Sequence, residues 1–106
     1  MANRTTVNVR RIPGGLDLRF AVTISERSSS SNHEVTVSSA TVAALRGDSD
    51  QPETLIEAAI RFLLDRERKE SILARFDIAV IPRYFSDFES ALPQYLAQAR
   101  KNTGKS

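Results

Sequence analysis

The stretch Leu16-Asp17-Leu18-Arg19-Phe20-Ala21-Val22-Thr23-Ile24-Ser25 decides the fold, because apolar and polar side chains alternate along it. Successive side chains of a β-strand point to opposite faces, so a period of two places every second side chain on one face. We therefore predict a strand over residues 16–27 in which Phe20 and Val22 face a core. Arg19 and Thr23 then lie on the opposite, outward face.

A second strand is predicted upstream of this one. Residues 6–10 alternate in the same way, with Val7 and Val9 as the core pair. Pro13-Gly14-Gly15 lies between the two strands, and a proline followed by residues that tolerate positive φ is typical of a turn. The two segments are therefore predicted to form a hairpin.

A third strand is predicted over residues 34–38, with Val35 and Val37 facing inward. The polar residues 28–32 have no apolar side chain to bury, so we expect them to form a mobile hairpin tip. His33 follows this tip and is predicted to be a solvated turn residue. The three strands make an antiparallel meander.

From Ser39 onward the hydrophobic period becomes 3.6, which is typical of amphipathic helices. The pattern predicts helices over residues 39–46, 52–65, 70–76 and 88–99. The second of these has the most continuous apolar stripe, formed by Leu55, Ile56, Ala59, Ile60 and Leu63. Glu57, Arg61 and Asp65 follow one another at i, i+4 spacing and are predicted to form its exposed face.

The element order β-β-β-α-α-α-α predicts an α+β fold. In it, the three-stranded antiparallel meander packs against three to four C-terminal helices. The length of 106 residues suits one domain, which we place at residues 1–99. The basic residues 100–106 are predicted to be a disordered tail.

Composition narrows the classes of function. Fifteen Lys and Arg side chains against thirteen Asp and Glu give a net charge of +2, so the chain is almost balanced. With no cysteine it has no disulfide, thiol nucleophile or zinc-thiolate site. Its apolar runs are too short for a membrane span and no secretory signal is visible, so we expect a soluble cytoplasmic protein without membrane association.

The sequence offers little that is typical of an enzyme. His33 is the single histidine, between a serine run and Glu34. A Ser-His-acid site requires groups that converge from rigid elements, and a mobile tip does not supply them. One histidine without cysteine makes a poor transition-metal site, and Gly14-Gly15 lacks the pattern of a phosphate-binding loop. We therefore predict a protein that is not an enzyme and has no catalytic residues, metal or cofactor.

Two surfaces are candidates for binding. The outward face of the meander carries amide and guanidinium groups, and residues 1–36 have five positive against three negative charges. Because such groups read base edges in a nucleic-acid groove, this face predicts nucleic-acid contact through Asn8, Arg10, Arg19 and Arg27.

The second surface is aromatic. Five of the seven aromatic residues lie in the last third of the chain, where they either close the core or line a groove for a partner. Several of them follow Pro82 in a segment that we expect to be irregular, where aromatic side chains are partly exposed. We therefore predict partner contact through Arg83, Tyr84, Phe85 and Phe88. The free edge of the meander is a further contact surface, suited to a weak homodimer or an added strand.

One part of the chain resembles other proteins. The runs 62–67, 69–73, 76–78 and 81–85, read Phe-Leu-Leu-Asp-Arg-Glu, Lys-Glu-Ser-Ile-Leu, Phe-Asp-Ile and Ile-Pro-Arg-Tyr-Phe, resemble a recurrent block in small uncharacterised bacterial proteins of unknown function. The resemblance covers about residues 52–97. It implies a bacterial cytoplasmic protein and no mechanism.

Taken together, these patterns predict a non-catalytic protein-interaction module with an unidentified protein partner. The alternative is a nucleic-acid-binding protein that uses the outer face of its sheet. These two functions depend on different residues, so the placement of those residues in the fold separates them.

Overall fold

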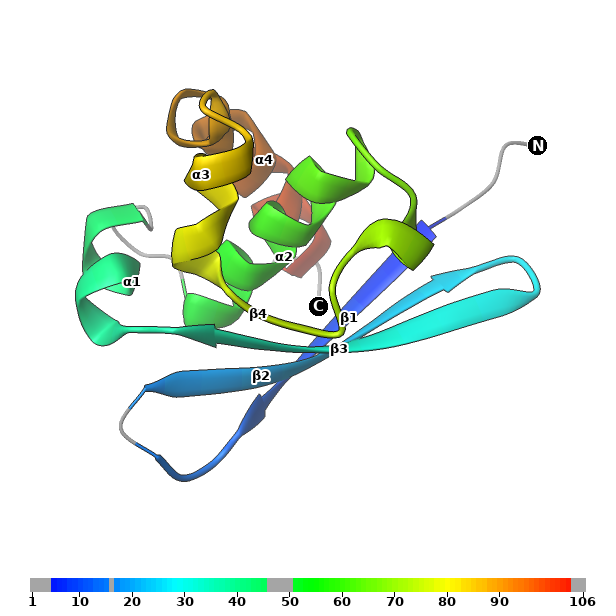
Figure 1. Cartoon of the computed structure of the whole chain (residues 1–106), viewed down its shortest axis with the longest axis horizontal. Coiled ribbons are helices and arrows are strands. Elements are labelled where there is room, and N and C mark those ends of the chain that lie inside the picture. Colours follow the sequence, from blue (N-terminus) through cyan, green and yellow to red (C-terminus); the bar gives the residue numbers. More distant parts are fainter. Residues whose placement is uncertain (1–4, 16, 46–50, 104–106) are drawn as a thin grey trace.

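A computed structural model describes residues 5–15, 17–45 and 51–103, and it has two layers: a four-stranded sheet and the helices that cover one of its faces (Figure 1). The strands run in the order β1-β2-β3-β4, namely β1 (Thr5–Ile12), β2 (Leu18–Glu26), β3 (Ser29–Val37) and β4 (Arg75–Asp77). The helices are α1 (Ser39–Leu45), α2 (Pro52–Leu64), α3 (Ile81–Tyr84) and α4 (Phe88–Thr103), with short 3-10 turns η1 (Lys69–Ser71) and η2 (Ile78–Val80). The predicted α+β class is confirmed.

The strand register confirms which side chains face the core. Val9 of β1 lies opposite Val22 of β2, and Phe20 of β2 lies opposite Val35 of β3. Phe20, Val22 and Val35 are at most 1% exposed, beneath the helices. The period of two therefore predicted the buried face correctly.

The β2–β3 hairpin is longer than predicted. β3 begins at Ser29, and only Arg27 and Ser28 form the turn, with Arg27 at a φ of +33°. The prediction of a mobile tip over residues 28–32 is wrong, because the serines pair with β2 and their backbone groups gain ladder hydrogen bonds. His33 is 6% exposed on the inner face, so the prediction of a solvated turn histidine is also wrong.

The segment after α2 differs most from the prediction. A helix was expected over residues 70–76, but the chain forms η1 and then β4, which pairs in parallel with β3. The amide of Glu34 donates to the carbonyl oxygen of Ala74 at 2.7 Å, which fixes the start of this added strand. A segment this short takes its conformation from its neighbours rather than from its own propensity.

α2 is buried on almost all sides, because the sheet covers one side of it and α4 covers another. The predicted exposed face is therefore partly wrong. Glu57 is only 5% exposed, and its Oε2 accepts a hydrogen bond of 2.9 Å from Nε of Arg61. This pairing offsets the cost of removing a carboxylate from water.

α4 continues through Pro93 and ends at Thr103, beyond the predicted domain end at residue 99. Residues 100–103, predicted to be tail, therefore belong to a helix, and residues 104–106 lie outside the described residues. Residue 16 of the predicted second strand and residue 46 of the predicted first helix are also outside them. None of the helices described is long and apolar enough to span a membrane.

Candidate functional site

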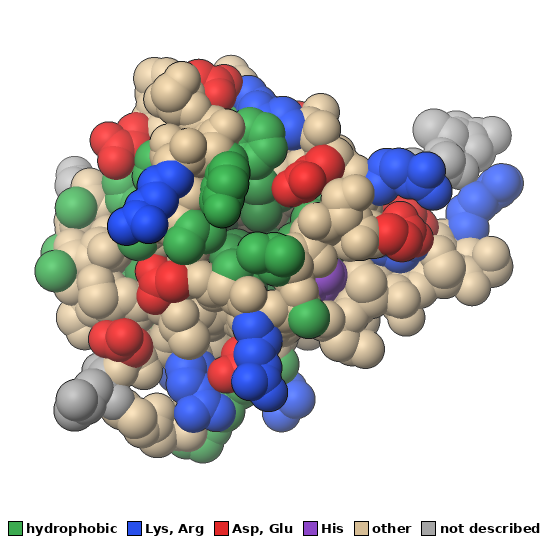
Figure 2. Space-filling model, viewed as in Figure 1, with side chains coloured by type: hydrophobic (Ala, Val, Ile, Leu, Met, Phe, Trp, Pro, Cys, Tyr) green, Lys and Arg blue, Asp and Glu red, His purple; other side chains and the backbone are tan. Residues whose placement is uncertain are grey.

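An apolar groove lies between the segment that follows α2 and the short helix α3. Its volume is about 280 Å³. Figure 2 shows hydrophobic side chains gathered on this face of the molecule, where α3 and β4 lie in Figure 1. The groove is lined by Leu63, Glu67, Ser71, Ile72, Leu73, Phe76, Val80, Ile81, Tyr84 and Phe85.

The rim of this groove carries two unusually exposed side chains. Leu73 is 59% exposed and Tyr84 is 75% exposed, and among the described residues no other large hydrophobic side chain is exposed. Single exposed apolar residues are ordinary on a protein surface, but two that line one apolar groove make this groove a candidate binding surface.

Phe85, which lines the groove, belongs to an aromatic cluster around Phe62 of α2. The Phe62 ring meets the rings of Phe85, Phe88 and Tyr95 edge to face, with centroids 5.8, 5.0 and 5.6 Å away. Arg66 covers the remaining face of Phe62, with its Cζ 3.7 Å from the ring centroid. Because these rings hold one another in place, Phe85 presents a fixed surface to the groove.

The four residues predicted to contact a partner therefore divide. Tyr84 and Phe85 line the groove, and Arg83 is exposed next to them on α3. Phe88 is fully buried, so its predicted role as a contact residue is wrong. As the first residue of α4 it points into the aromatic cluster, where burial of a large ring stabilises the fold.

Backbone hydrogen-bond acceptors fix the wall that carries Leu73. Nδ1 of His33 donates to the carbonyl oxygen of Leu73 at 2.8 Å, and the adjacent Ala74 carbonyl accepts from the Glu34 amide. Nε2 of His33 lies 2.7 Å from Oγ of Ser31 on the same strand face. The single histidine thus joins the inner face of β3 to the groove.

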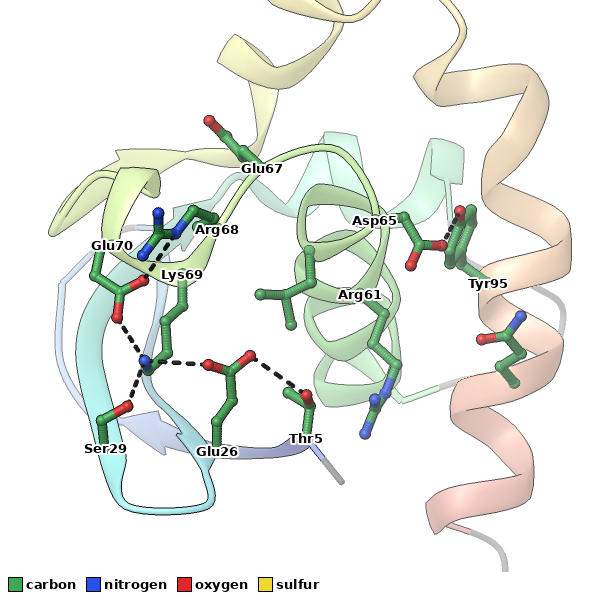
Figure 3. A pocket seen from close by; sticks show the side chains of 12 residues that line it. Thr5, Glu26, Ser29, Arg61, Asp65, Glu67, Arg68, Lys69, Glu70 and Tyr95 are labelled. Carbon is green, nitrogen blue, oxygen red and sulfur yellow. Dashed lines mark hydrogen bonds and ion pairs between the residues drawn. The ribbon is translucent and has the colours of Figure 1, made fainter. Parts of the chain in front are cut away.

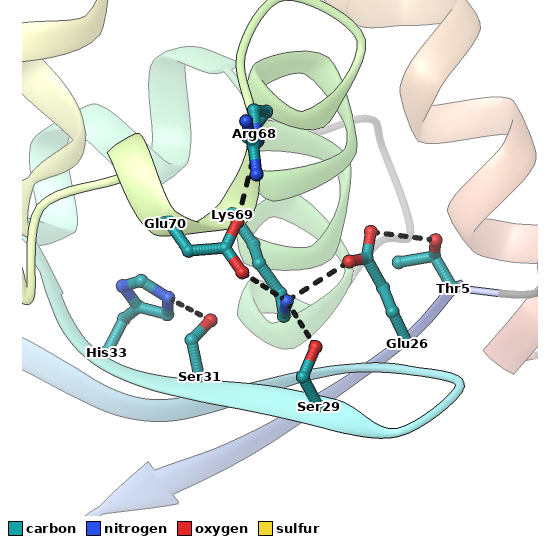
Figure 4. A network of polar contacts seen from close by, with 8 residues as sticks. All are labelled: Thr5, Glu26, Ser29, Ser31, His33, Arg68, Lys69 and Glu70. Carbon is teal, nitrogen blue, oxygen red and sulfur yellow. Dashed lines mark hydrogen bonds and ion pairs between the residues drawn. The ribbon is translucent and has the colours of Figure 1, made fainter.

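Lys69 anchors the start of the same wall (Figure 4). Its side chain is 3% exposed, and its Nζ lies 2.6 Å from Glu70, 2.7 Å from Ser29 and 3.1 Å from Glu26. The hydrogen bond with Glu70 and the neighbouring Glu26 raise the pKa of Lys69, against the opposing effect of burial. η1 is therefore tied to the tip of the β2–β3 hairpin.

Sequence reasoning missed this anchor, because Lys69 stands within a run of charged residues that looks solvated. Its partners Glu26 and Ser29 lie at least 40 residues away in the sequence, and only the hairpin brings them under η1. The sequence feature that comes closest to indicating this anchor is the alternation of apolar and polar residues before Glu26, because it predicts that the strand reaches Glu26.

A polar recess of about 730 Å³ adjoins the Lys69 cluster, between the hairpin, α2 and α4. At its far side the Tyr95 hydroxyl donates to Oδ2 of Asp65 at 2.6 Å, which raises the pKa of Tyr95. Glu67 lines both the recess and the apolar groove. Figure 3 shows its carboxylate pointing away from the Lys69 ion pairs.

The residues predicted to contact nucleic acid are spread over the uncovered face of the sheet. Asn8 and Arg10 are exposed there, whereas Arg27 lies in the hairpin turn. Arg19 is half-buried, with its Nε 3.5 Å from Oε2 of Glu34. Arg75 of β4 lies 3.9 Å from the other oxygen of Glu34, so this carboxylate offsets charge at the centre of the face.

Within residues 5–15, 17–45 and 51–103, histidine and acidic side chains do not gather in a group of three or more that could hold a metal ion. Comparison of the chain with protein-family models, with curated proteins and with solved structures finds no match. The function of the protein is therefore inferred from the geometry of the groove and of the sheet.

Proposed function

We propose that this protein is a non-catalytic protein-interaction module that receives an apolar side chain of a partner protein in the groove beside Tyr84. The observation that carries the proposal is that Leu73 and Tyr84, the exposed large hydrophobic side chains of the described residues, both line one apolar groove. A volume of about 280 Å³ is enough for one or two large side chains, which matches the anchor residues that dominate most interfaces.

The negative charge of Glu67 at the groove supports a more specific description of the partner. Glu67 lines the groove, is half-buried, and its carboxylate has no ion pair or hydrogen bond among the described residues. A half-buried carboxylate gains most from a charge-assisted hydrogen bond with a cation. We therefore expect a partner segment with an aliphatic or aromatic anchor and a neighbouring Lys or Arg that reaches Glu67.

The fixed walls support tight recognition of such a segment. Leu73 is held through its carbonyl by His33, and Phe85 is held by Phe62. Binding to a surface that is already ordered costs less conformational entropy than binding to a loop. The groove is therefore suited to a rigid contact with little rearrangement.

The decisive experiment selects ligands without assuming a partner. A random library of displayed peptides is panned against the whole chain, and enriched peptides are titrated by fluorescence anisotropy. We expect an apolar anchor next to Lys or Arg in these peptides. Tyr84→Ser should weaken binding at least tenfold, whereas the matched control Tyr84→Phe, which keeps the ring, should retain it.

Two further measurements make the test specific. Glu67→Gln should weaken binding severalfold, and the loss should shrink at high salt because the contact is ionic. Tyr84→Ser should leave the free energy of unfolding within about 0.5 kcal/mol, because the ring is mostly exposed. Enriched peptides that bind Tyr84→Ser and Leu73→Ser as well as the wild type would refute the proposal.

Nucleic-acid binding through the uncovered sheet face is the competing function. The exposed Asn8 and Arg10 favour it, but the pairing of Arg19 and Arg75 with Glu34 weakens the positive field that such binding needs. Filter binding of duplex DNA and RNA at low salt tests it. Retention that falls steeply with salt and is reduced in Arg10→Ala would make it the leading function.

A further inference from the structure

The outer side of β1 is an open sheet edge. β1 is the terminal strand in the order β1-β2-β3-β4, so within the described residues its far side has no neighbouring strand. It is eight residues long, contains no proline, and carries charge only at Arg10 and Arg11, in its second half. β4, at the other edge, is only three residues long.

The register shows which backbone groups of β1 are unpaired. A two-residue hairpin loop makes Glu26 and Ser29 a hydrogen-bonded pair, and such pairs alternate along antiparallel strands. The odd-numbered residues of β2 therefore direct their backbone groups to β1, and their partners there are Thr6, Asn8, Arg10 and Ile12. The N–H and C=O groups left facing outward belong to Thr5, Val7, Val9 and Arg11.

An observation on β3 supports this alternation. The same alternation along β3 predicts that the Glu34 amide points away from β2 and toward β4. This amide does donate a hydrogen bond to the carbonyl oxygen of Ala74, next to β4. The assignment of the free groups on β1 therefore agrees with a measured contact elsewhere in the sheet.

The core is also incomplete at this edge. On the inner face, Val22 and Ile24 of β2 are at most 1% exposed, whereas Val9 of β1 is only half-buried and Val7 is 8% exposed. An added strand beside β1 would remove further apolar surface from water. The edge thus offers unpaired backbone groups together with one partly exposed valine, Val9.

We propose that β1 pairs with β1 of a second copy of this chain, in antiparallel fashion about a two-fold axis at Asn8. This axis runs perpendicular to the sheet, so the helices of both copies lie on the same side of one continuous sheet. Two residues that lie opposite each other across the new strand pair must therefore belong to the same face. Asn8 then faces Asn8, Val7 faces Val9, Thr5 faces Arg11, and Thr6 faces Arg10.

This register is favoured by its chemistry. It joins the two valines, sets each arginine opposite a threonine, and places no arginine against another. The Asn8 amide is exposed and carries both donors and acceptors, so two copies can hydrogen-bond across the axis. Centring the axis on Val9 would place Arg11 against Val7, and centring it on Arg10 would bring like charges together.

The first test measures the oligomeric state of the whole chain by sedimentation equilibrium, without any other ligand. We expect a reversible dimer. Asn8→Lys places two ammonium groups at the axis and should weaken the dimer at least tenfold. The matched control Asn32→Lys makes the same change at an exposed position on β3, away from the edge, and should leave the dimer intact.

The second test reads the register. Because the chain has no cysteine, Asn8→Cys introduces a single thiol, and non-hydrogen-bonded partners have Cα atoms about 4.5 Å apart, within disulfide reach. Under mild oxidation Asn8→Cys should cross-link to itself. Thr6→Cys and Arg10→Cys should cross-link to each other in a mixture more readily than either does alone.

Three results would overturn this inference. They are a chain that stays monomeric at millimolar concentration, a dimer that Asn8→Lys leaves unchanged, and cross-linking that does not favour the predicted pairs. None of them bears on peptide binding beside Tyr84, because that groove lies over α3 and β4 at the opposite end of the strand order. The two proposals therefore stand or fall separately.

Discussion

Nδ1 of His33 donates a hydrogen bond of 2.8 Å to the carbonyl oxygen of Leu73, 40 residues away in the sequence. Because a carbonyl oxygen can only accept, Nδ1 carries a proton. In the neutral ring Nε2 is then the acceptor for the Ser31 hydroxyl. One buried side chain thus links a β-strand of the core to an exposed wall of the groove.

Replacement of this histidine should destabilise the fold. His33→Leu leaves the part-buried Leu73 carbonyl without its donor, and the loss of such a hydrogen bond costs about 0.5–1.5 kcal/mol. Ser31→Ala should cost less, because it leaves the hydrogen bond between His33 and the Leu73 carbonyl in place. Urea unfolding measures both, and a His33→Leu variant as stable as the wild type would contradict the structural role of this bond.

The Lys69 anchor should control the order of η1. Lys69→Met removes the cation and leaves Glu26 and Glu70 as like charges, so the melting temperature should fall. Amide hydrogen exchange at Ser71 and Ile72 should accelerate, because their hydrogen bonds close η1. Arg68→Met is the matched control: its side chain is 86% exposed, so exchange and melting should change little.

Acidification should weaken the same cluster. The Lys69 ammonium, then a backbone amide, lowers the pKa of Glu70 from its ordinary value of 4.5. A carboxyl whose pKa is lower in the folded state contributes stability above its unfolded pKa and loses it as the pH falls. Stability should therefore fall below about pH 4.5, and Glu70→Gln should flatten that slope in urea unfolding at several pH values. If Glu70→Gln leaves the slope of stability against pH unchanged, Glu70 does not contribute to the loss of stability in acid.

Tyr95 should titrate above its ordinary pKa of 10.0, because its hydroxyl donates to Asp65. The chain has two tyrosines, so Tyr84→Phe leaves Tyr95 as the single chromophore for an absorbance titration of tyrosinate. Adding Asp65→Asn should lower the pKa of Tyr95. Since the neutral phenol is favoured in the folded state, this contact contributes stability below pH 10 and loses it as the pH rises. A pKa of Tyr95 that Asp65→Asn leaves unchanged would contradict the hydrogen bond between the two side chains.

The elements with strong periodicity were predictable from the sequence. Alternation located the core face of β2, and the stripe from Leu55 to Leu63 located α2, because each pattern extends over several turns or pleats. Residues 70–76 were not predictable, since a short segment with two or three apolar residues fits a helix turn and an edge strand equally well. Pairing with β3 decides between them.

The candidate site was predictable only in part. Tyr84 and Phe85 were found through the irregular segment around Pro82, which limits how fully its aromatics can be buried. Phe88 was expected at the surface, but it is the first residue of α4 and packs against Phe62. Leu73 lies in the segment predicted to be a helix over residues 70–76, and in the structure it is exposed just before β4.

The sequence alone determined the class of fold and the side of each long strand that meets the helices, because these depend on local spacing of apolar side chains. Tertiary structure decided the fourth strand, the burial of His33 and Lys69, and the groove beside Tyr84. The fourth strand and the burial of His33 and Lys69 depend on groups about forty residues apart, and only the folded chain brings such groups within a few ångströms of one another. The groove depends on the packing of α3 against the segment that follows α2.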